Sequence, residues 1–351
     1  MAERVALRAL RESKGLTQTQ LAGRCGTTRQ SLSAIEAGRV DPSVTLALAL
    51  AEALGGTVET LFGRRGAPTL GAEAAERLLP GAPVLVGSVG GRFVAHATGR
   101  HGSTPPFGAD GSVLTSSRGL VQIACERPAD DAVFVAGCAP VLGALLERLS
   151  RSVRTTRYVW LPRATDRALD LLSRRLVHVA GIHSFPEISE LTTKLSPGLS
   201  AFTLVGFTTG LARPLSSRVR SLQDLRARDL RLALREPGSG ARRVFDRQLS
   251  NAGVEASHLD EESTIVDDHA DAARIVSLGL ADAGLTIGPV AHAHALDLLP
   301  LELDRFDLVI PTATLDDPPI RALVEAMNGK AFRKEARALG YDVEQMGAEI
   351  R

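Results

Sequence analysis

The chain has 351 residues, of which 44% are hydrophobic and 23% are charged, with 41 Lys and Arg against 40 Asp and Glu. This length accommodates two or three domains, and the composition is that of an ordinary globular protein. The net charge of +1 excludes a polycation, so any basic surface for nucleic acid must be local. Only 4% of the residues are aromatic, which argues against a stacking platform for single-stranded nucleic acid.

No run of about 20 apolar residues predicts a membrane helix, and the first residues lack the apolar core of a signal peptide. We therefore expect a cytoplasmic protein with no membrane partner. The three cysteines, Cys25, Cys125 and Cys138, have neither the number nor the spacing typical of disulfides or metal sites. They are predicted to be free thiols.

Residues 1–62 are predicted to be entirely helical. Polar capping residues, apolar residues three and four positions apart, and glycines after each run indicate the boundaries. An amphipathic helix ends near Lys14, and further helices are expected at 18–24, 28–37, 44–54 and 58–62. Residues 1–65 also contain nine Lys or Arg against six Asp or Glu, so the local basic surface is expected here.

The next segment changes in character. Residues 63–80 begin with a run rich in Gly and Arg, and we predict a flexible linker. Short runs of β-type residues separated by Gly, Pro and Ser follow, and they predict a small antiparallel β unit within residues 81–130.

From residue 131 to residue 351, strands and helices alternate. Strands are expected at 132–135, 158–160, 177–180, 202–207, 230–234 and 283–287, and helices at 141–149, 166–174, 241–251 and 268–279. This alternation is typical of parallel α/β layers. The predicted fold class is therefore multidomain, with an all-α five-helix domain, a small β unit and an α/β domain.

One motif in the helical segment is specific. The runs are LTQTQLA at 16–22, GTTRQSLSAIEAGR at 26–39 and PS at 42–43. Together they resemble the XRE-type (phage repressor and Cro) helix-turn-helix family over about the whole of its five-helix domain. A tight Gly turn before a helix rich in short polar residues also suits entry into the major groove of DNA.

The resemblance implies that the third helix is the recognition helix. Arg29 has the donor geometry for guanine, and Gln30 has that for adenine. By the same resemblance, Gln18 and Arg39 contact phosphates, and Arg11 pairs with Glu36. The residues expected to contact double-stranded DNA are Gln18, Thr28, Arg29, Gln30, Ser33 and Arg39. One such domain reads half a site, so we expect a homodimer on a palindromic operator.

Five features of the C-terminal domain resemble a periplasmic-binding-protein-like (type II) substrate-binding domain of the molybdate- and molybdopterin-associated kind. They are VAGCAP at 135–140, VHVAGIHS at 177–184, REPGSGAR at 235–242, LGLADAGL at 278–285, and Tyr341. The resemblance implies two α/β lobes on a hinge, with a ligand in the cleft between them. It also implies that the chain crosses between lobes at Thr208 to Gly210 and returns near Thr286.

Strands that end in Gly and lead into a helix leave N–H groups free at the helix N-terminus, where anions bind. The Gly-Ser-Gly at 238–240 can equally be a tight turn without a ligand, and His183, Thr209 and Thr286 can serve the core instead. The ligand-binding residues expected are Gly137, Cys138, Ala139, His183, Ser184, Thr209, Ser239, Gly240, Ala241, Arg242 and Thr286.

The chain departs from this resemblance at two places. Ala139 stands where an acidic residue is expected, and residues 163–166 stand where a Gly/Ser-rich anion loop is expected. The ligand therefore stays open between a molybdate- or tungstate-type oxyanion, a molybdopterin-type metabolite and none. Two runs suggest a metal site, His292 with His294 and Asp267-Asp268-His269. Metal binding is not predicted for either run, because helix residues two positions apart do not share a face.

The leading hypothesis is a one-component transcriptional regulator, in which a small anionic ligand shifts the population of DNA-competent dimers. We find no nucleophile elbow, phosphate-binding loop or dinucleotide fingerprint, so neither an enzyme nor a cofactor is expected. Two alternatives stay open: a catalytic α/β domain tethered to a DNA-binding module, and a regulator whose sensor domain only dimerises. A cleft with paired acid and base groups would favour the enzyme.

Overall fold

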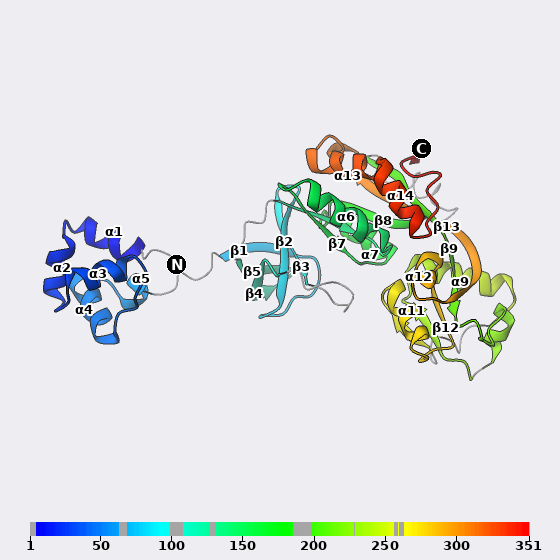
Figure 1. Ribbon diagram of the computed structural model, residues 1–351, viewed down its shortest axis with the longest axis horizontal. Coiled ribbons are helices and arrows are strands. Elements are labelled where there is room, and N and C mark those ends of the chain that lie inside the picture. The colour runs from blue at the N-terminus through cyan, green and yellow to red at the C-terminus, as the bar shows by residue number, and fades with distance from the viewer. Residues whose placement is uncertain are drawn as a thin grey trace. The chain divides into compact units, whose positions relative to one another are not determined.

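The computed structural model describes residues 5–62, 69–98, 108–125, 131–184, 198–227, 229–255, 259 and 263–350 (Figure 1). The chain divides into two compact units, residues 1–70 with 124–126 and residues 71–123 with 127–351. The first part of the predicted linker, residues 63–68, lies outside the described residues.

The N-terminal unit contains the five predicted helices. They are α1 (Val5–Ser13), α2 (Gln18–Arg24), α3 (Arg29–Glu36), α4 (Val44–Leu54) and α5 (Val58–Phe62). Thr17, Thr28 and Ser43 begin α2, α3 and α4, because each side-chain oxygen accepts an N–H of the first helical turn. The apolar residues of the helices form one core of their own: Leu7, Leu21, Leu32, Ile35, Leu50 and Leu54.

A closed barrel of five short strands follows. The strands are β1 (Thr69–Ala74), β2 (Pro83–Val89), β3 (Arg92–Ala97), β4 (Gly111–Ser117) and β5 (Leu120–Cys125), in the order β1-β3-β2-β4-β5. The sequence predicted every one of these strands except β1.

Strand β1 corrects the prediction of a linker at 63–80, which does not hold for residues 69–80. The buried side chains there are Ala72, Ala74, Ala75 and Leu78. Three of the four are alanines, which are depleted in strands and therefore gave no β-type pattern. β1 also runs parallel to β3, so the β unit is not purely antiparallel as predicted.

The α/β domain is built on one mixed sheet, in the order β11-β10-β12-β9-β13-β8-β6-β7, with β14 paired to β9. The strands are β6 (Ala132–Ala136), β7 (Arg157–Leu161), β8 (Val179–Ser184), β9 (Leu199–Arg213), β10 (Leu232–Arg235), β11 (Thr264–Val266), β12 (Ala283–Ile287), β13 (Asp297–Pro311) and β14 (Glu349–Ile350). The prediction of parallel layers is correct for β6, β7 and β8 and for β10, β11 and β12. It fails for β9, which pairs antiparallel with β12 and with β13, a strand that the sequence did not predict.

The long strands β9 and β13 divide the sheet into two lobes (Figure 1). Lobe 1 contains β6, β7 and β8, and lobe 2 contains β10, β11 and β12. β8 pairs with Arg305 to Val309 of β13, whereas β12 pairs with Thr209 to Ala212 of β9. Each of the two 15-residue strands therefore belongs to both lobes.

The chain crosses to lobe 2 near Thr209 of β9, as predicted. It returns along β13, where Leu303 pairs with Thr208 and Asp304 with Phe207. The prediction of a return crossing at Thr286 is wrong, because this residue pairs with Gly210 inside lobe 2. The charged residues and Pro300 of β13 interrupted the strand pattern in the sequence.

Helices cover both faces of lobe 1. α6 (Val141–Ser152), α13 (Pro318–Asn328) and α14 (Lys330–Ala338) pack with one set of sheet residues, among them Val133, Val135 and Phe306. α7 (Thr165–Ser173) and the barrel share a second core with the opposite face of β6, through Phe134 and Ala136. The alternation of side chains along β6 produces this division.

Lobe 2 has its own helices and core. They are α9 (Gly240–Asn251), α11 (His269–Ser277) and α12 (Gly288–Ala293), with the short 3-10 helix η1 (Leu222–Arg226). A second 3-10 helix, η2 (Thr312–Thr314), follows β13. Leu232, Leu234, Phe245 and Leu285 lie in the core of this lobe.

The barrel is joined to lobe 1 by polar as well as apolar contacts. The Arg157 guanidinium donates to both carboxylate oxygens of the buried Asp110, at 2.9 and 2.6 Å. His96 in β3 bonds to the carbonyl of Leu176 at 2.8 Å. The side chain of Phe134 leaves no room for a Cβ at Gly87. Barrel and lobe 1 therefore form one continuous core.

None of the described helices has the length and apolar character to cross a membrane.

Candidate functional site

The exposed face of α3 carries most of the residues predicted to contact DNA. Thr28 caps the helix, and its Oγ1 accepts a hydrogen bond from the N–H of Ser31 at 3.0 Å. An open hollow of about 600 Å³ is lined by four predicted residues, Arg29, Gln30, Ser33 and Arg39, together with Ala34 and Val40. The structure therefore places two guanidinium groups and an amide on one face.

Beneath this face, the predicted pair of Arg11 and Glu36 is confirmed. Arg11 Nε donates to Glu36 Oε1 at 2.6 Å and Arg11 Nη2 to Oε2 at 3.2 Å, and both side chains are buried. Gln18 Nε2 donates to the same Oε2 at 2.8 Å. The Gln18 amide, predicted to contact phosphate, is thus also part of the contact between α1, α2 and α3.

Removing one partner of this buried pair should destabilise the helices by about 3 kcal/mol, because the other charge is left buried and unpaired. Arg11→Ala and Glu36→Ala in the full chain should each speed amide hydrogen exchange in α2 and α3. The double variant should lose less free energy of unfolding than the two single variants lose together. Strict additivity in this cycle would contradict a coupled pair.

The residues predicted to bind a ligand lie on both lobes. In lobe 1, Gly137, Cys138 and Ala139 connect β6 to α6, and His183 and Ser184 end β8. Thr209 lies at the crossing of β9. In lobe 2, Ser239 caps α9, Gly240 begins it, Ala241 and Arg242 follow, and Thr286 lies on β12. The Ser184 side chain lies outside the described part of the chain.

The two lobes touch where Gly240 meets His183. A Cβ built on Gly240 would lie 2.3 Å from Cγ of His183 and 2.4 Å from its Cβ. Only a residue without a side chain fits this approach, since real Cβ atoms do not come so close. The N-terminus of α9 in lobe 2 is therefore packed directly on the end of β8 in lobe 1.

Gly240→Ala should push the lobes apart or strain them, and it should lower the free energy of unfolding by about 1–3 kcal/mol. Urea unfolding followed by Trp160 fluorescence should show the loss. Gly288→Ala is the matched control, because a Cβ there meets its nearest atoms at 3.6 and 3.7 Å. Equal stability of Gly240→Ala and the native chain would show that this contact is absent in solution.

Arg242 does not have the surroundings expected of an anion ligand. Its Nε donates to Asp246 Oδ1 at 2.7 Å, one turn along the same helix. A different arginine, Arg235 at the end of β10, is fully buried. Its Nε and Nη2 bond to the Glu236 carboxylate, and Nη1 has no hydrogen-bond partner among the described residues. The sequence pattern predicted Arg242 as the charged group and not Arg235, because Arg235 lies in a strand before the Gly-Ser-Gly turn.

His269 was rejected as a metal ligand from the sequence and was not among the predicted ligand residues, because its neighbours in the chain do not share its helix face. It begins α11 and is completely buried, and both of its ring nitrogens are unpartnered among the described residues. Its ring centroid lies 5.7 Å from that of His183. Thr286 Oγ1 donates to the His269 carbonyl at 2.9 Å, so this predicted ligand residue positions the histidine backbone.

Asp304, at the return crossing, orients His183. Its Oδ2 lies 2.6 Å from His183 Nδ1 and accepts a hydrogen bond from Thr209 Oγ1 at 3.3 Å. His183 Nε2 points away from this carboxylate and has no partner among the described residues. A buried polar atom left unpaired costs about 1–3 kcal/mol, so these unpartnered nitrogens require an explanation.

The charges of the cluster depend on one another. Burial lowers the pKa of His183, but the Cys138 thiolate and the Asp304 carboxylate raise it, to about 10. Burial raises the pKa of Cys138, and the nearby His183 more than offsets this, so the pKa is below its usual value. Burial, Arg235 and His183 together lower the pKa of His269 well below its usual value. The arrangement favours an imidazolium at His183 and a neutral imidazole at His269.

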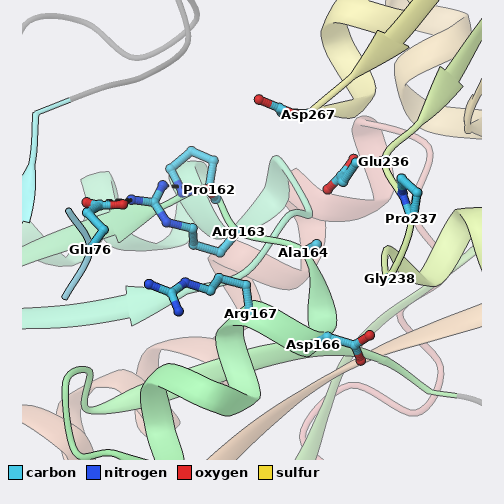
Figure 2. A pocket seen from close by; sticks show the side chains of 10 residues that line it. All are labelled: Glu76, Pro162, Arg163, Ala164, Asp166, Arg167, Glu236, Pro237, Gly238 and Asp267. Carbon is cyan, nitrogen blue, oxygen red and sulfur yellow. Dashed lines mark hydrogen bonds and ion pairs between the residues drawn. The ribbon is translucent and has the colours of Figure 1, made fainter.

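A polar cavity of about 460 Å³ lies between residues of the two lobes (Figure 2). Residues of both lobes and of the barrel line it, and the charged ones are Glu76, Arg163, Asp166, Arg167, Glu236 and Asp267. Arg163 Nη2 donates to both oxygens of Glu76, at 3.2 and 3.1 Å. Residues 163–166, where an anion loop was expected, thus place Arg163 in an ion pair with the barrel.

Family comparisons match both parts of the chain. A PBP superfamily domain matches residues 146–328, and a helix-turn-helix family matches residues 7–61. An uncharacterized HTH-type transcriptional regulator of Methanothermobacter thermautotrophicus is 50% identical over 52 residues, which cover 15% of this chain and 75% of that protein.

The C-terminal part has similar proteins of its own. The uncharacterized protein YvgK of Bacillus subtilis is 33% identical over 133 residues, 38% of this chain, and the match spans only 42% of YvgK. A solved structure from Clostridium perfringens is described as a phosphate ABC transporter substrate-binding protein with bound phosphate. The match covers 60% of this chain and 98% of the Clostridium perfringens chain. Its TM-score is 0.50 at 12% identity, which shows a shared fold alone.

Proposed function

The chain belongs to the PBP superfamily over residues 146–328 and to the helix-turn-helix transcriptional regulators over residues 7–61, and we propose that it is a one-component, cytoplasmic regulator. One polypeptide then both binds double-stranded DNA and senses a small ligand. One observation carries this proposal. The exposed polar face of α3 and the unpartnered buried nitrogens between two lobes occur in the same chain.

The DNA-binding part rests on the α3 face. Arg29 and Gln30 have the donor patterns that read guanine and adenine in the major groove. Because one domain reads half a site, the proposal includes a homodimer on a palindromic operator.

Arg29→Ala should weaken operator binding by about 1–3 kcal/mol and relax the preference at one base pair. Fluorescence anisotropy at one fixed salt concentration, with an operator selected from a random library, measures both effects. Arg8→Ala is the matched control, because Arg8 is an exposed arginine of α1 that pairs with Glu12. An Arg29→Ala protein with native affinity and specificity would show that α3 is not the recognition helix.

The sensor part rests on the cleft. Arg235 Nη1 and the first N–H groups of α9 supply donors for an oxyanion such as molybdate or tungstate, and the lobes close over it. A molybdopterin-type molecule would present similar anionic groups. Ligand binding would then shift the population of DNA-competent dimers.

An oxyanion that binds the native state should raise the melting temperature of the full chain, and at a hundred times its Kd this corresponds to about 2.7 kcal/mol. Molybdate, tungstate and phosphate are the anions to compare. Arg235→Lys should reduce the shift, because it removes the Nη1 donor. Arg274→Lys, an exposed arginine on α11, is the control. A melting temperature unchanged by all three anions would refute an oxyanion ligand and leave the DNA-binding proposal intact.

A catalytic role has one observation in its favour. Cys138, His183 and Asp304 stand in the order of nucleophile, base and orienting carboxylate. Against it, His183 Nε2 has no hydrogen-bond partner in the described part of the chain, and Cys138 is only 2% exposed. Alkylation of Cys138 by iodoacetamide much faster than that of Cys125 would favour the enzyme.

A further inference from the structure

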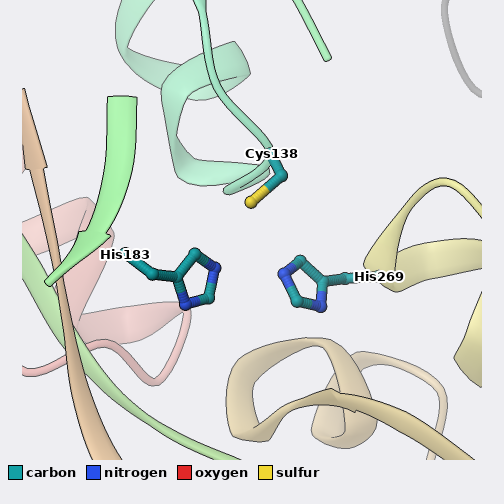
Figure 3. Close-up of side chains that lie close together, drawn as sticks. All are labelled: Cys138, His183 and His269. Carbon is teal, nitrogen blue, oxygen red and sulfur yellow. The ribbon is translucent and has the colours of Figure 1, made fainter. Parts of the chain in front are cut away.

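Three potential metal ligands converge between the lobes (Figure 3). Cys138 follows β6, His183 lies on β8, and His269 begins α11. One donor atom from each residue lies within 4.8 Å of the other two, and all three side chains are buried. Two of the ligands come from lobe 1 and the third from lobe 2, so the set is complete only when the lobes are together.

The ring nitrogens are available for a further partner. His183 Nε2 and both nitrogens of His269 are buried without a hydrogen-bond partner among the residues that the structure describes. Figure 3 shows both rings and the thiol directed into the same space. In a packed core, buried imidazole nitrogens usually have hydrogen-bond partners.

The surroundings orient these ligands in the way metal sites do. Asp304 engages His183 Nδ1 at 2.6 Å, which leaves Nε2 as the coordinating nitrogen. Thr209 bonds to the same carboxylate oxygen, and Thr286 fixes the backbone of His269. Each of the two histidines therefore has a neighbour that limits its movement.

We propose that Cys138, His183 and His269 bind a divalent cation that prefers thiolate and imidazole ligands, with Zn²⁺ as the first choice, and that this cation joins lobe 1 to lobe 2. One thiolate and two imidazoles are a ligand set typical of zinc. Binding needs no redox step, because the cation only displaces protons that its ligands carry, and these protons pass to solvent. The inference rests on the proposed function only in placing the cation in the sensor cleft.

The neighbouring cavity supports entry of a cation. Four carboxylates and two guanidinium groups line it, and one of the carboxylates belongs to Asp267, two residues before His269 in the chain (Figure 2). Three protein ligands leave one position of a four-coordinate ion open. An anion can occupy that position, so a cation and the proposed anionic ligand are compatible in one cleft.

Cobalt is a suitable probe, because Co²⁺ takes the same ligands and its bond to a thiolate absorbs strongly in the near ultraviolet. The chelator-treated, reduced full chain should bind one equivalent of Co²⁺ with this absorption, and Zn²⁺ should displace it. Cys138→Ser should abolish the thiolate band. His269→Asn should weaken Zn²⁺ binding more than about 100-fold, beyond the effect expected of Asp304→Asn, about 10- to 100-fold.

The other two thiols provide matched controls. Cys25→Ser and Cys125→Ser should bind Co²⁺ like the native chain, and Trp160 fluorescence should establish that each variant is folded. Absence of one-equivalent binding, or a thiolate band that persists in Cys138→Ser, would overturn the site. Tight Zn²⁺ binding unaffected by His269→Asn and by His269→Gln would overturn the bridge between the lobes.

The proposed function is tested separately by operator binding. Metal binding with no operator binding would refute the regulator and leave the metal site supported. Operator binding without any uptake of Co²⁺ or Zn²⁺ would overturn the metal site alone.

Discussion

A buried carboxylate at the crossing between the lobes determines the arrangement of the site. Asp304 lies on β13 where this strand passes from lobe 2 back to lobe 1, and it is only 9% exposed. Burial of a charge is costly unless partners surround it. His183 from lobe 1 and Thr209 from β9 supply those partners. The strand that connects the lobes therefore also fixes the orientation of the imidazole that faces the cleft.

Two neighbouring histidines of the cluster differ in charge although both are buried. His183 lies between a thiol and a carboxylate, which raise its pKa, whereas His269 lies near Arg235 and His183, which lower its pKa. Both are fully buried, so the difference comes from their neighbours and not from exposure. The cluster thereby places one positive imidazole next to one neutral imidazole and avoids two like charges at close range.

Local sequence patterns predicted most of the helices and strands. They did not predict contacts between residues that are far apart in the chain. Capping residues and apolar spacing predicted the first and last residues of α2 and α4 correctly. The crossing between the lobes at Thr208 to Gly210 was also predicted correctly. β13 was missed because Pro300 and alternating charges hide a strand whose burial comes from its neighbours. His183 and Cys138 were selected as ligand residues, but His269 was not, since its companions lie 86 and 131 residues earlier in the chain. The pairing of Arg242 with Asp246, too, depends on rotamers that a motif does not specify.

The shared core of the barrel and lobe 1 has a consequence for signalling. The polypeptide leaving the helix-turn-helix domain enters β1, and the barrel is anchored to lobe 1 through Asp110, His96 and Glu76. The helix-turn-helix domain is thus connected in sequence to the barrel and lobe 1, and lobe 2 is joined to lobe 1 through β9 and β13. In the proposed regulator, a movement of lobe 2 would reach the helix-turn-helix domain through noncovalent surfaces that lobe 2 creates or removes. Those surfaces are where mutation should alter the allosteric response.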